Sequence, residues 1–195
     1  MGPHRPSRRN VHHANRVVIV ALSPEDAAWA REVGRARISL APGNPKFAYK
    51  ERNGLDTHTV GAMAELAAAR GLGIPWPARV NTFRSLPDLD PFWEVRWSSN
   101  PKRVKVSTDD PPHYLVLHVT GQDPIFEVHG FIVARWVQEN RPLEDPGNRG
   151  WAAHFARAYD LTPVEQHVVC QYANDWGPTT GWMCIICGEK YEVAA

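Results

Sequence analysis

The chain has 195 residues, 43% of them hydrophobic and 22% charged, a composition typical of a globular protein with one core and at most a small second module. Its formal net charge of +1 predicts no overall field that would attract nucleic acid or a membrane surface. No apolar run approaches the roughly 20 residues of a membrane helix, and residues 1–16 are polar and basic where a secretory signal would be apolar. We therefore expect neither a membrane partner nor secretion.

The first 22 residues predict an arm followed by a strand. Residues 1–16 carry four arginines, three histidines and no acidic residue, so we expect a disordered basic arm that is either a solvated tail or a contact for a nucleic-acid backbone. The apolar run 17–22 predicts a strand. Ser23 and Pro24, followed by two acidic residues, predict the beginning of a helix, because serine caps helices, proline suits the first helical position and acids favour its positive end.

Residues 58–70 form the clearest predicted helix, ended by Gly71 and Gly73. Nearly all of its side chains are small, so it can pack closely against other elements. Glu65 stands in the middle of this apolar surface. It is either an exposed helix former or a carboxylate held against a metal site.

Residues 92–97 predict a strand in which three apolar side chains share one face, because side chains alternate along a strand. Glu94 and Arg96 then share the other face. A second signal comes from residues 114–120 and 125–134, which predict two strands of a hairpin. Residues 80–83 are a weaker candidate strand, and residues 139–150 are a polar stretch with no predicted strand.

Asp88, in a predicted turn, and the pair Glu94 and Arg96 form the strongest candidate for catalytic chemistry. Converging carboxylates repel one another unless a cation neutralises them, and Mg²⁺ prefers such oxygen ligands. Water bound to such a metal becomes acidic enough to attack a phosphodiester, and a nearby basic side chain stabilises charge on the phosphate. The alternative is a surface ion pair beside a turn-forming aspartate, which would contribute little.

Pro87-Asp88 and Glu94-Val95-Arg96, preceded by Glu65 on a helix, resemble the PD-(D/E)xK nuclease superfamily. More narrowly, residues 61–69 (GAMAELAAA) and 93–96 (WEVR) are similar to a group of small phage-type proteins with that fold. The resemblance covers residues 17–140. It implies an α/β, restriction-endonuclease-like domain over residues 17–160, with a mixed sheet flanked by helices. It also implies a nuclease that uses Mg²⁺ or Mn²⁺ on DNA in the cytoplasm of a bacterial or phage-infected cell.

Carried over residue by residue, the resemblance makes Glu65 the helix acid, Asp88 the motif aspartate and Glu94 the second acid. Asp90 is the alternative motif aspartate, because the spacing to the glutamate varies. Asp88 and Glu94 would then bind magnesium.

Arg96 departs from this family pattern, because it stands where lysine is usual. Arginine is effectively always protonated and cannot readily act as a base, although it can bind phosphate. Lys102 or Lys105 is an alternative cation from a following element. With Arg103, these residues either contact nucleic-acid phosphates, if their segment lines the cleft, or form a solvated strand or loop. The departure leaves open a catalytically inactive nucleic-acid-binding or adaptor protein with the same fold.

The three cysteines predict a small zinc module over residues 161–195. An odd count leaves a disulfide framework with one thiol over, so an intracellular metal site is the better interpretation. Two pairs with two-residue gaps resemble a zinc ribbon with histidine in place of the first cysteine, and they supply the four N/S ligands of a closed structural zinc site. His154 and Asp175 are alternative ligands. The predicted ligands are His167, Cys170, Cys184 and Cys187.

Overall fold

The computed structural model describes residues 17–40, 57–80, 86–146 and 152–164, and the backbone of residues 182–183 and 190–191. Within these ranges the protein is a mixed α/β structure with three α-helices, as expected at that level. No helix in the described part of the chain is long and apolar enough to cross a membrane. The predicted arm over residues 1–16, residues 81–83 of the weaker candidate strand and the four predicted zinc ligands lie outside the described residues.

The central element is a mixed four-stranded sheet with the strand order β1-β5-β4-β2. Strand β2 is parallel to β4, whereas the β4–β5 and β5–β1 pairs are antiparallel. The predicted hairpin is present, and its turn requires Gly121, whose φ is +96° and whose added Cβ would lie 2.4 Å from the carbonyl oxygen of Ile125. The strands are β1 (Val18–Ala21), β2 (Trp93–Trp97), β4 (Leu115–Gln122) and β5 (Ile125–Val133).

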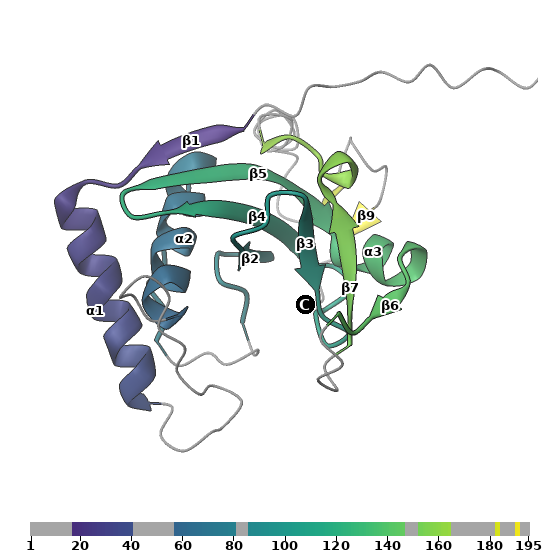
Figure 1. Cartoon of the computed structure of the whole chain (residues 1–195), viewed down its shortest axis with the longest axis horizontal. Coiled ribbons are helices and arrows are strands. Elements are labelled where there is room, and N and C mark those ends of the chain that lie inside the picture. Colours follow the sequence, from purple (N-terminus) through teal and green to yellow (C-terminus); the bar gives the residue numbers. More distant parts are fainter. Residues whose placement is uncertain are drawn as a thin grey trace, which may run out of the picture.

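Helix α2 (Thr57–Leu72) covers one face of this sheet, and helix α1 (Pro24–Leu40) packs against α2 at one end of the molecule (Figure 1). Helix α1 begins as predicted, with Ser23 Oγ accepting the Asp26 N–H at 3.1 Å. Helix α2 ends at Gly73, which has a φ of +68° and allows the Ile74 N–H to bond the carbonyl oxygen of Ala69 at 3.0 Å. The small side chains of α2 pack on the apolar face of β2, β4 and β5 to form the main core.

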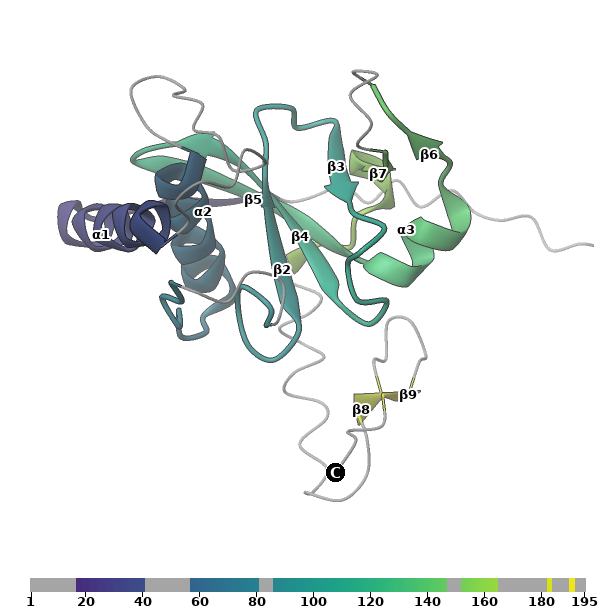
Figure 2. The ribbon, with the colours of Figure 1, turned by 90° about the horizontal axis from the view of Figure 1, so that it is seen from below.

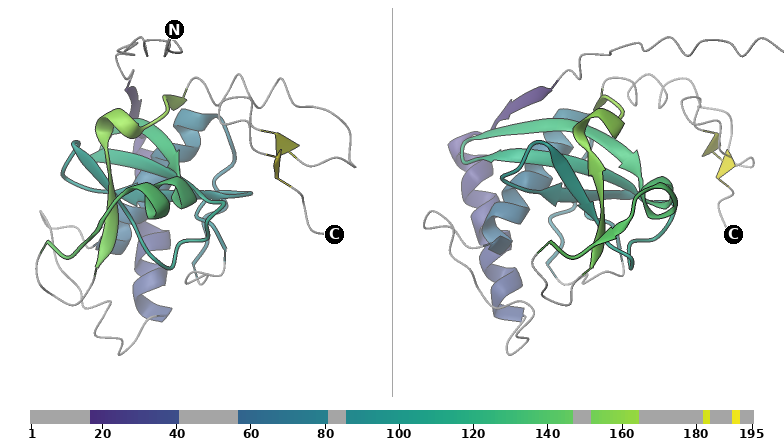
Figure 3. Two further views of the ribbon diagram at one scale, coloured as in Figure 1. Left: turned by 90° about the vertical axis from the view of Figure 1, so that its right-hand side faces the viewer. Right: turned by 45° about the vertical axis from the view of Figure 1, so that its right-hand side comes forward.

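A second, three-stranded sheet packs on the opposite face and crosses the first sheet steeply (Figures 2 and 3). Its order is β3-β7-β6, and its inner residues Val104, Val106 and Ala156 meet Val116 and Ile132 of the first sheet. The stretch 139–150, predicted without a strand, contains β6, because Leu143 and Glu144 pair with β7. The remaining elements are β3 (Arg103–Val106), α3 (Ala134–Asn140), β6 (Leu143–Glu144), β7 (Ala153–Arg157), the 3-10 turn η2 (Ala158–Asp160), β8 (Trp182–Met183) and β9 (Lys190–Tyr191).

Candidate active site

Strand β2 lies at the edge of the first sheet, and a tight turn brings Asp88 alongside it. The backbones of Leu89 and Trp93 exchange two hydrogen bonds of 3.0 Å, which fold the chain back on itself. Asp88 Oδ2 accepts the Val95 N–H at 2.8 Å on the edge of β2 away from β4. The alternative aspartate, Asp90, has a side chain that is 64% exposed and pairs with Arg79. Asp88 is therefore the aspartate that contacts the motif strand.

Arg96 lies between two carboxylates on the face of β2 opposite the helices. It pairs with Glu94 on its own strand, and its Nη2 donates to Asp110 Oδ1 at 2.6 Å. Asp110 is buried, and its Oδ2 accepts the Ser107 N–H at 2.7 Å in the turn after β3. The Gln138 side chain on α3 donates to the carbonyl oxygens of Ser107 and Asp110, which fixes this turn.

Asp110 has no motif signal in the sequence. The stretch Ser-Thr-Asp-Asp-Pro-Pro indicates only a turn, and the contact with Arg96 depends on how the second sheet packs against the first. Asp110 is thus a site residue that the local sequence pattern does not predict.

Glu65 is buried on α2, and both of its carboxylate oxygens accept hydrogen bonds. The Arg37 guanidinium on α1 donates to both of its carboxylate oxygens, at 2.6 and 2.7 Å, and Trp76 Nε1 lies 3.3 Å from Oε2. The interpretation of Glu65 as an exposed helix former is therefore wrong, because only 5% of the residue is accessible. Arg37 was not predicted either; it stands out in the sequence only as the basic residue in the last turn of α1.

The carboxylates of these elements interact electrostatically around the edge of β2. Burial raises the pKa of Asp88 well above its ordinary range, and the negative charges of Glu65 and Glu94 raise it further. Burial also raises the pKa of Glu94; the Arg96 charge opposes this rise, whereas Asp110 and Glu65 reinforce it. Glu65 on one face of the sheet and Glu94 on the other thus both raise the pKa of Asp88 at the edge of β2.

Asp88 and Glu94 are the residues that could hold a hard divalent cation, because Mg²⁺ prefers carboxylate oxygens. Raised carboxylate pKa values mean that the ionised forms lack full compensation from the protein, which is the deficit that Mg²⁺ would supply. Among the described residues no three His, Asp or Glu side chains are grouped closely enough to hold an ion together. Ligation would therefore use Asp88 and Glu94 with water completing the shell, as Mg²⁺ commonly does.

No protein family, curated protein or solved structure matches this chain. What the site can do therefore follows from the geometry and charge of its own residues.

The predicted phosphate-binding residues lie on the second sheet. Arg103 and Lys105 alternate with the buried Val104 and Val106 along β3, so they point away from the first sheet and from Glu94. Lys102 is exposed in the turn before β3. The cation beside Glu94 is therefore Arg96, and none of these three basic residues replaces it.

Of the alternative zinc ligands, His154 lies on β7 with its Nδ1 2.7 Å from the carbonyl oxygen of Arg141, and Asp175 is outside the described residues. Strands β8 and β9 pair antiparallel, with Trp182 opposite Tyr191 and Met183 opposite Lys190. This pairing brings together the two ends of the segment that contains Cys184 and Cys187.

Proposed function

We propose that this protein is a metal-dependent nuclease that hydrolyses phosphodiester bonds in DNA, with Asp88 and Glu94 holding Mg²⁺ or Mn²⁺. The supporting observation is the pair of incompletely compensated carboxylates with raised pKa values at the edge of β2. Buried carboxylates with perturbed pKa values that interact electrostatically are typical of functional sites. The PD-(D/E)xK-like order of Asp88, Glu94 and Arg96, and the restriction-endonuclease-like fold that it implies, belong to this proposal.

In this proposal each residue around the metal has its own part. The bound metal would supply an acidic water and stabilise charge on the phosphate. Arg96 remains protonated and contacts the scissile phosphate, while Asp110 and Glu94 set the position of its guanidinium. Glu65, fixed by Arg37, adds negative charge near Asp88 and favours cation binding there.

A non-catalytic nucleic-acid-binding or adaptor protein is the second candidate, and one observation favours it. Arg96 already pairs with both Glu94 and Asp110, so its guanidinium provides part of the compensation that a metal would provide. In such a protein the carboxylates of Glu94 and Asp110 would only hold Arg96 in place, and no phosphodiester would be cleaved.

We also propose that His167, Cys170, Cys184 and Cys187 bind one structural zinc. The antiparallel β8–β9 pair supports this, because it places Met183 opposite Lys190, and both cysteines lie between these two residues in the sequence. Such a closed site has no open position for substrate, so the zinc would have no catalytic part.

A cleavage assay on the full chain tests the proposed nuclease. Purified protein is incubated with supercoiled plasmid and with linear DNA, in Mg²⁺, Mn²⁺ or EDTA, beside the double variant Asp88→Asn, Glu94→Gln. Two exposed glutamates on α1 provide a matched control, Glu25→Gln, Glu32→Gln. We expect metal-dependent nicking by the native protein and the control, and a loss of at least about a hundredfold in the site variant, as for removal of a major electrostatic contributor. Equal nicking by the site variant would overturn the assignment, and no nicking by the native protein would favour the second candidate.

A further inference from the structure

The outward face of β3 and β7 concentrates positive charge in a chain whose net charge is only +1. Arg103 lies opposite Arg157 in the register of the two strands, and Lys105 lies opposite Phe155. The exposed Lys102 precedes β3 directly. The acidic residue that meets this face is Glu144 of β6, which lies 3.5 Å from Arg103 and 3.9 Å from Arg157.

Aromatic side chains are interleaved with these cations. The Arg103 guanidinium lies over the Phe155 ring, with Cζ 4.5 Å from the ring centroid. Tyr159, in η2 directly after β7, is 78% exposed, and its ring centroid lies 6.0 Å from Cζ of Arg141. The Ala158 N–H bonds the carbonyl oxygen of Lys102 at 3.0 Å, which holds this turn beside the beginning of β3.

We propose that this face, defined by Lys102, Arg103, Lys105, Phe155, Arg157 and Tyr159, is a platform for single-stranded DNA. Lysine and arginine along a strand neutralise successive phosphates, while exposed aromatic and guanidinium planes stack on unpaired bases. A duplex keeps its base faces covered, so Tyr159 and the Arg103–Phe155 pair have no partner in it. The platform deepens the proposed nuclease function by naming the substrate class, and its link to cleavage rests on that function.

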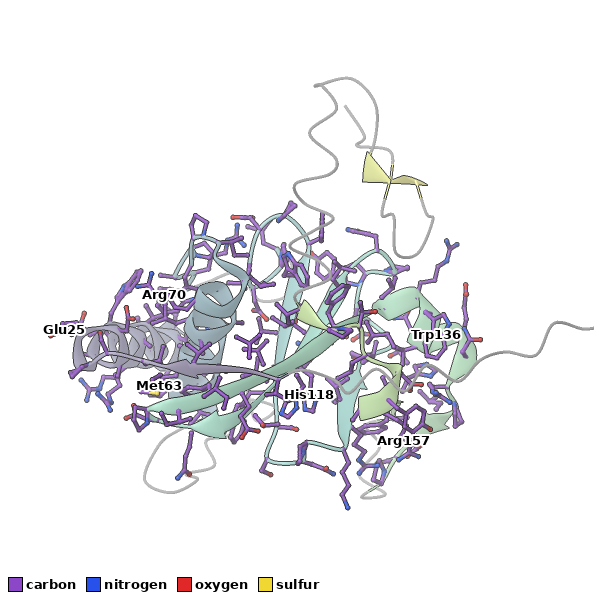
Figure 4. All side chains as sticks on the ribbon, turned by 90° about the horizontal axis from the view of Figure 1, so that it is seen from above. Glu25, Met63, Arg70, His118, Trp136 and Arg157 are labelled. Atoms are coloured by element: carbon purple, nitrogen blue, oxygen red, sulfur yellow. The ribbon has the colours of Figure 1, made fainter. Side chains whose placement is uncertain are left out.

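The platform and the candidate active site share β3. The strand that carries Arg103 and Lys105 continues into the turn whose Ser107 N–H and Asp110 carboxylate are joined, and Asp110 holds Arg96. Helix α1 lies at the other end of the molecule, as the positions of Glu25 and Arg157 show in Figure 4. Lys102 and Arg103 lie at the beginning of β3 and Lys105 near its end, so a strand that follows β3 from Lys102 to Lys105 runs toward the turn that holds Asp110.

Binding measured without cleavage tests the platform by itself. The anisotropy of a labelled oligothymidine is followed in EDTA over a series of salt concentrations, with duplex DNA and oligouridine as competitors. Two single variants separate the two contacts. Lys105→Gln should weaken binding and lower the salt slope by about 0.7, the value for one phosphate contact on a single strand. Tyr159→Ala should weaken binding about five- to tenfold and leave the slope unchanged, because stacking releases no counterion.

The control variant Arg35→Gln, Leu40→Ala removes one charge and one exposed apolar side chain from α1, and it should bind as the native protein does. The binding assay contains no free divalent metal, so a loss of cleavage alone leaves the platform standing. Unchanged affinity and slope in both platform variants, or no salt-dependent binding of oligothymidine by the native protein, would overturn the proposal. Equal competition by duplex DNA would also overturn it, and tighter binding of oligouridine would rule out DNA as the preferred strand.

Discussion

Protonation of Asp88 is coupled to folding because its pKa is higher in the folded protein than in the unfolded chain. A group of this kind contributes stability at pH values below its unfolded pKa, and that contribution is lost as the pH rises through the folded pKa. At neutral pH, which is well above its unfolded pKa, the Asp88 carboxyl group therefore opposes folding. A cation bound beside it would reverse this effect.

Replacing Asp88 with a neutral side chain of similar shape should therefore stabilise the protein when no metal is present. Asp88→Asn, whose amide oxygen still accepts the Val95 N–H, should raise the thermal midpoint in EDTA at pH 7 by about 2–4 °C per kcal/mol of relieved repulsion. It should also remove the stabilisation that Mg²⁺ gives to the native protein, since binding to the folded state alone raises stability. Differential scanning fluorimetry with and without Mg²⁺ measures both effects, with Glu25→Gln as control. A lower midpoint for Asp88→Asn at pH 7 would contradict this account.

The pKa of His118 is lower in the folded protein than in the unfolded chain, so protonation of this residue opposes folding. It is fully buried on β4, near the centre of the molecule in Figure 4, and its Nε2 lies 3.2 Å from Ser98 Oγ. Burial, followed by the charge of the stacked His129, lowers the pKa of His118 to about 4. Within the described residues its Nδ1 has no hydrogen-bond partner, so a proton there gains nothing in the folded state.

As the pH falls from about 6.5 to 4, the unfolded chain takes up a proton on His118 before the folded protein does, and stability is lost. Between pH 7.5 and pH 5 the loss from this residue should be about 2 kcal/mol. His118→Gln should be less stable at pH 7.5 but should lose less stability on acidification. Denaturant unfolding at both pH values measures the difference, and an identical pH dependence in the two proteins would sink the prediction.

At the scale of elements, the position of Glu65 depends on how closely α1 approaches α2. An added Cβ at Gly34 would lie 2.5 Å from Thr59 Cα and 2.7 Å from Thr59 Oγ1. Gly34 is one turn before Arg37, so the same close approach allows the guanidinium to reach Glu65. The small side chains of α2 therefore serve the site as well as the core.

Gly34→Ala should destabilise the protein by about 1–3 kcal/mol, because overpacking outweighs the gain in helix propensity. Gly61→Ala on α2 is the matched control, since its new Cβ meets nothing within 4 Å, and it should be neutral or stabilising by up to about 1 kcal/mol. Urea unfolding of both variants measures the contrast. If the two substitutions change stability equally, the packing of α1 on α2 does not set this geometry.

Elements with strong local signals could be predicted from the sequence, including the Ser23 cap, the helix around Glu65, and the β4–β5 hairpin. The shared face of Glu94 and Arg96 followed from strand alternation and is present as their ion pair. The second sheet was not predicted, because its strands are short and pair across long sequence separations. For the same reason Arg37 and Asp110 were missed, since each reaches the site only through packing between elements.

At the scale of the whole molecule, the proposed zinc module should be independent of the two-sheet core. A closed site with four ligands would supply the folding free energy of such a small module by itself. We expect one zinc per purified chain, and its loss in Cys184→Ser, Cys187→Ser without a change in the thermal midpoint of the core. His167→Gln should also lose zinc, whereas His154→Gln should keep it. Metal analysis with a chelator measures this, and well under one zinc in the native chain would contradict the prediction.

The hydrogen bond between Asp88 and the Val95 N–H has a consequence for solubility. Strand β2 ends the first sheet, and an uncovered edge strand offers its amide groups to any other extended chain. The Asp88 carboxylate occupies one of these donors and places a charge where a foreign strand would dock. Because this bond uses Oδ2, Oδ1 remains available to ligate a cation without giving up the protection. Asp88 can thus limit self-association at this edge while keeping one oxygen for the proposed cation.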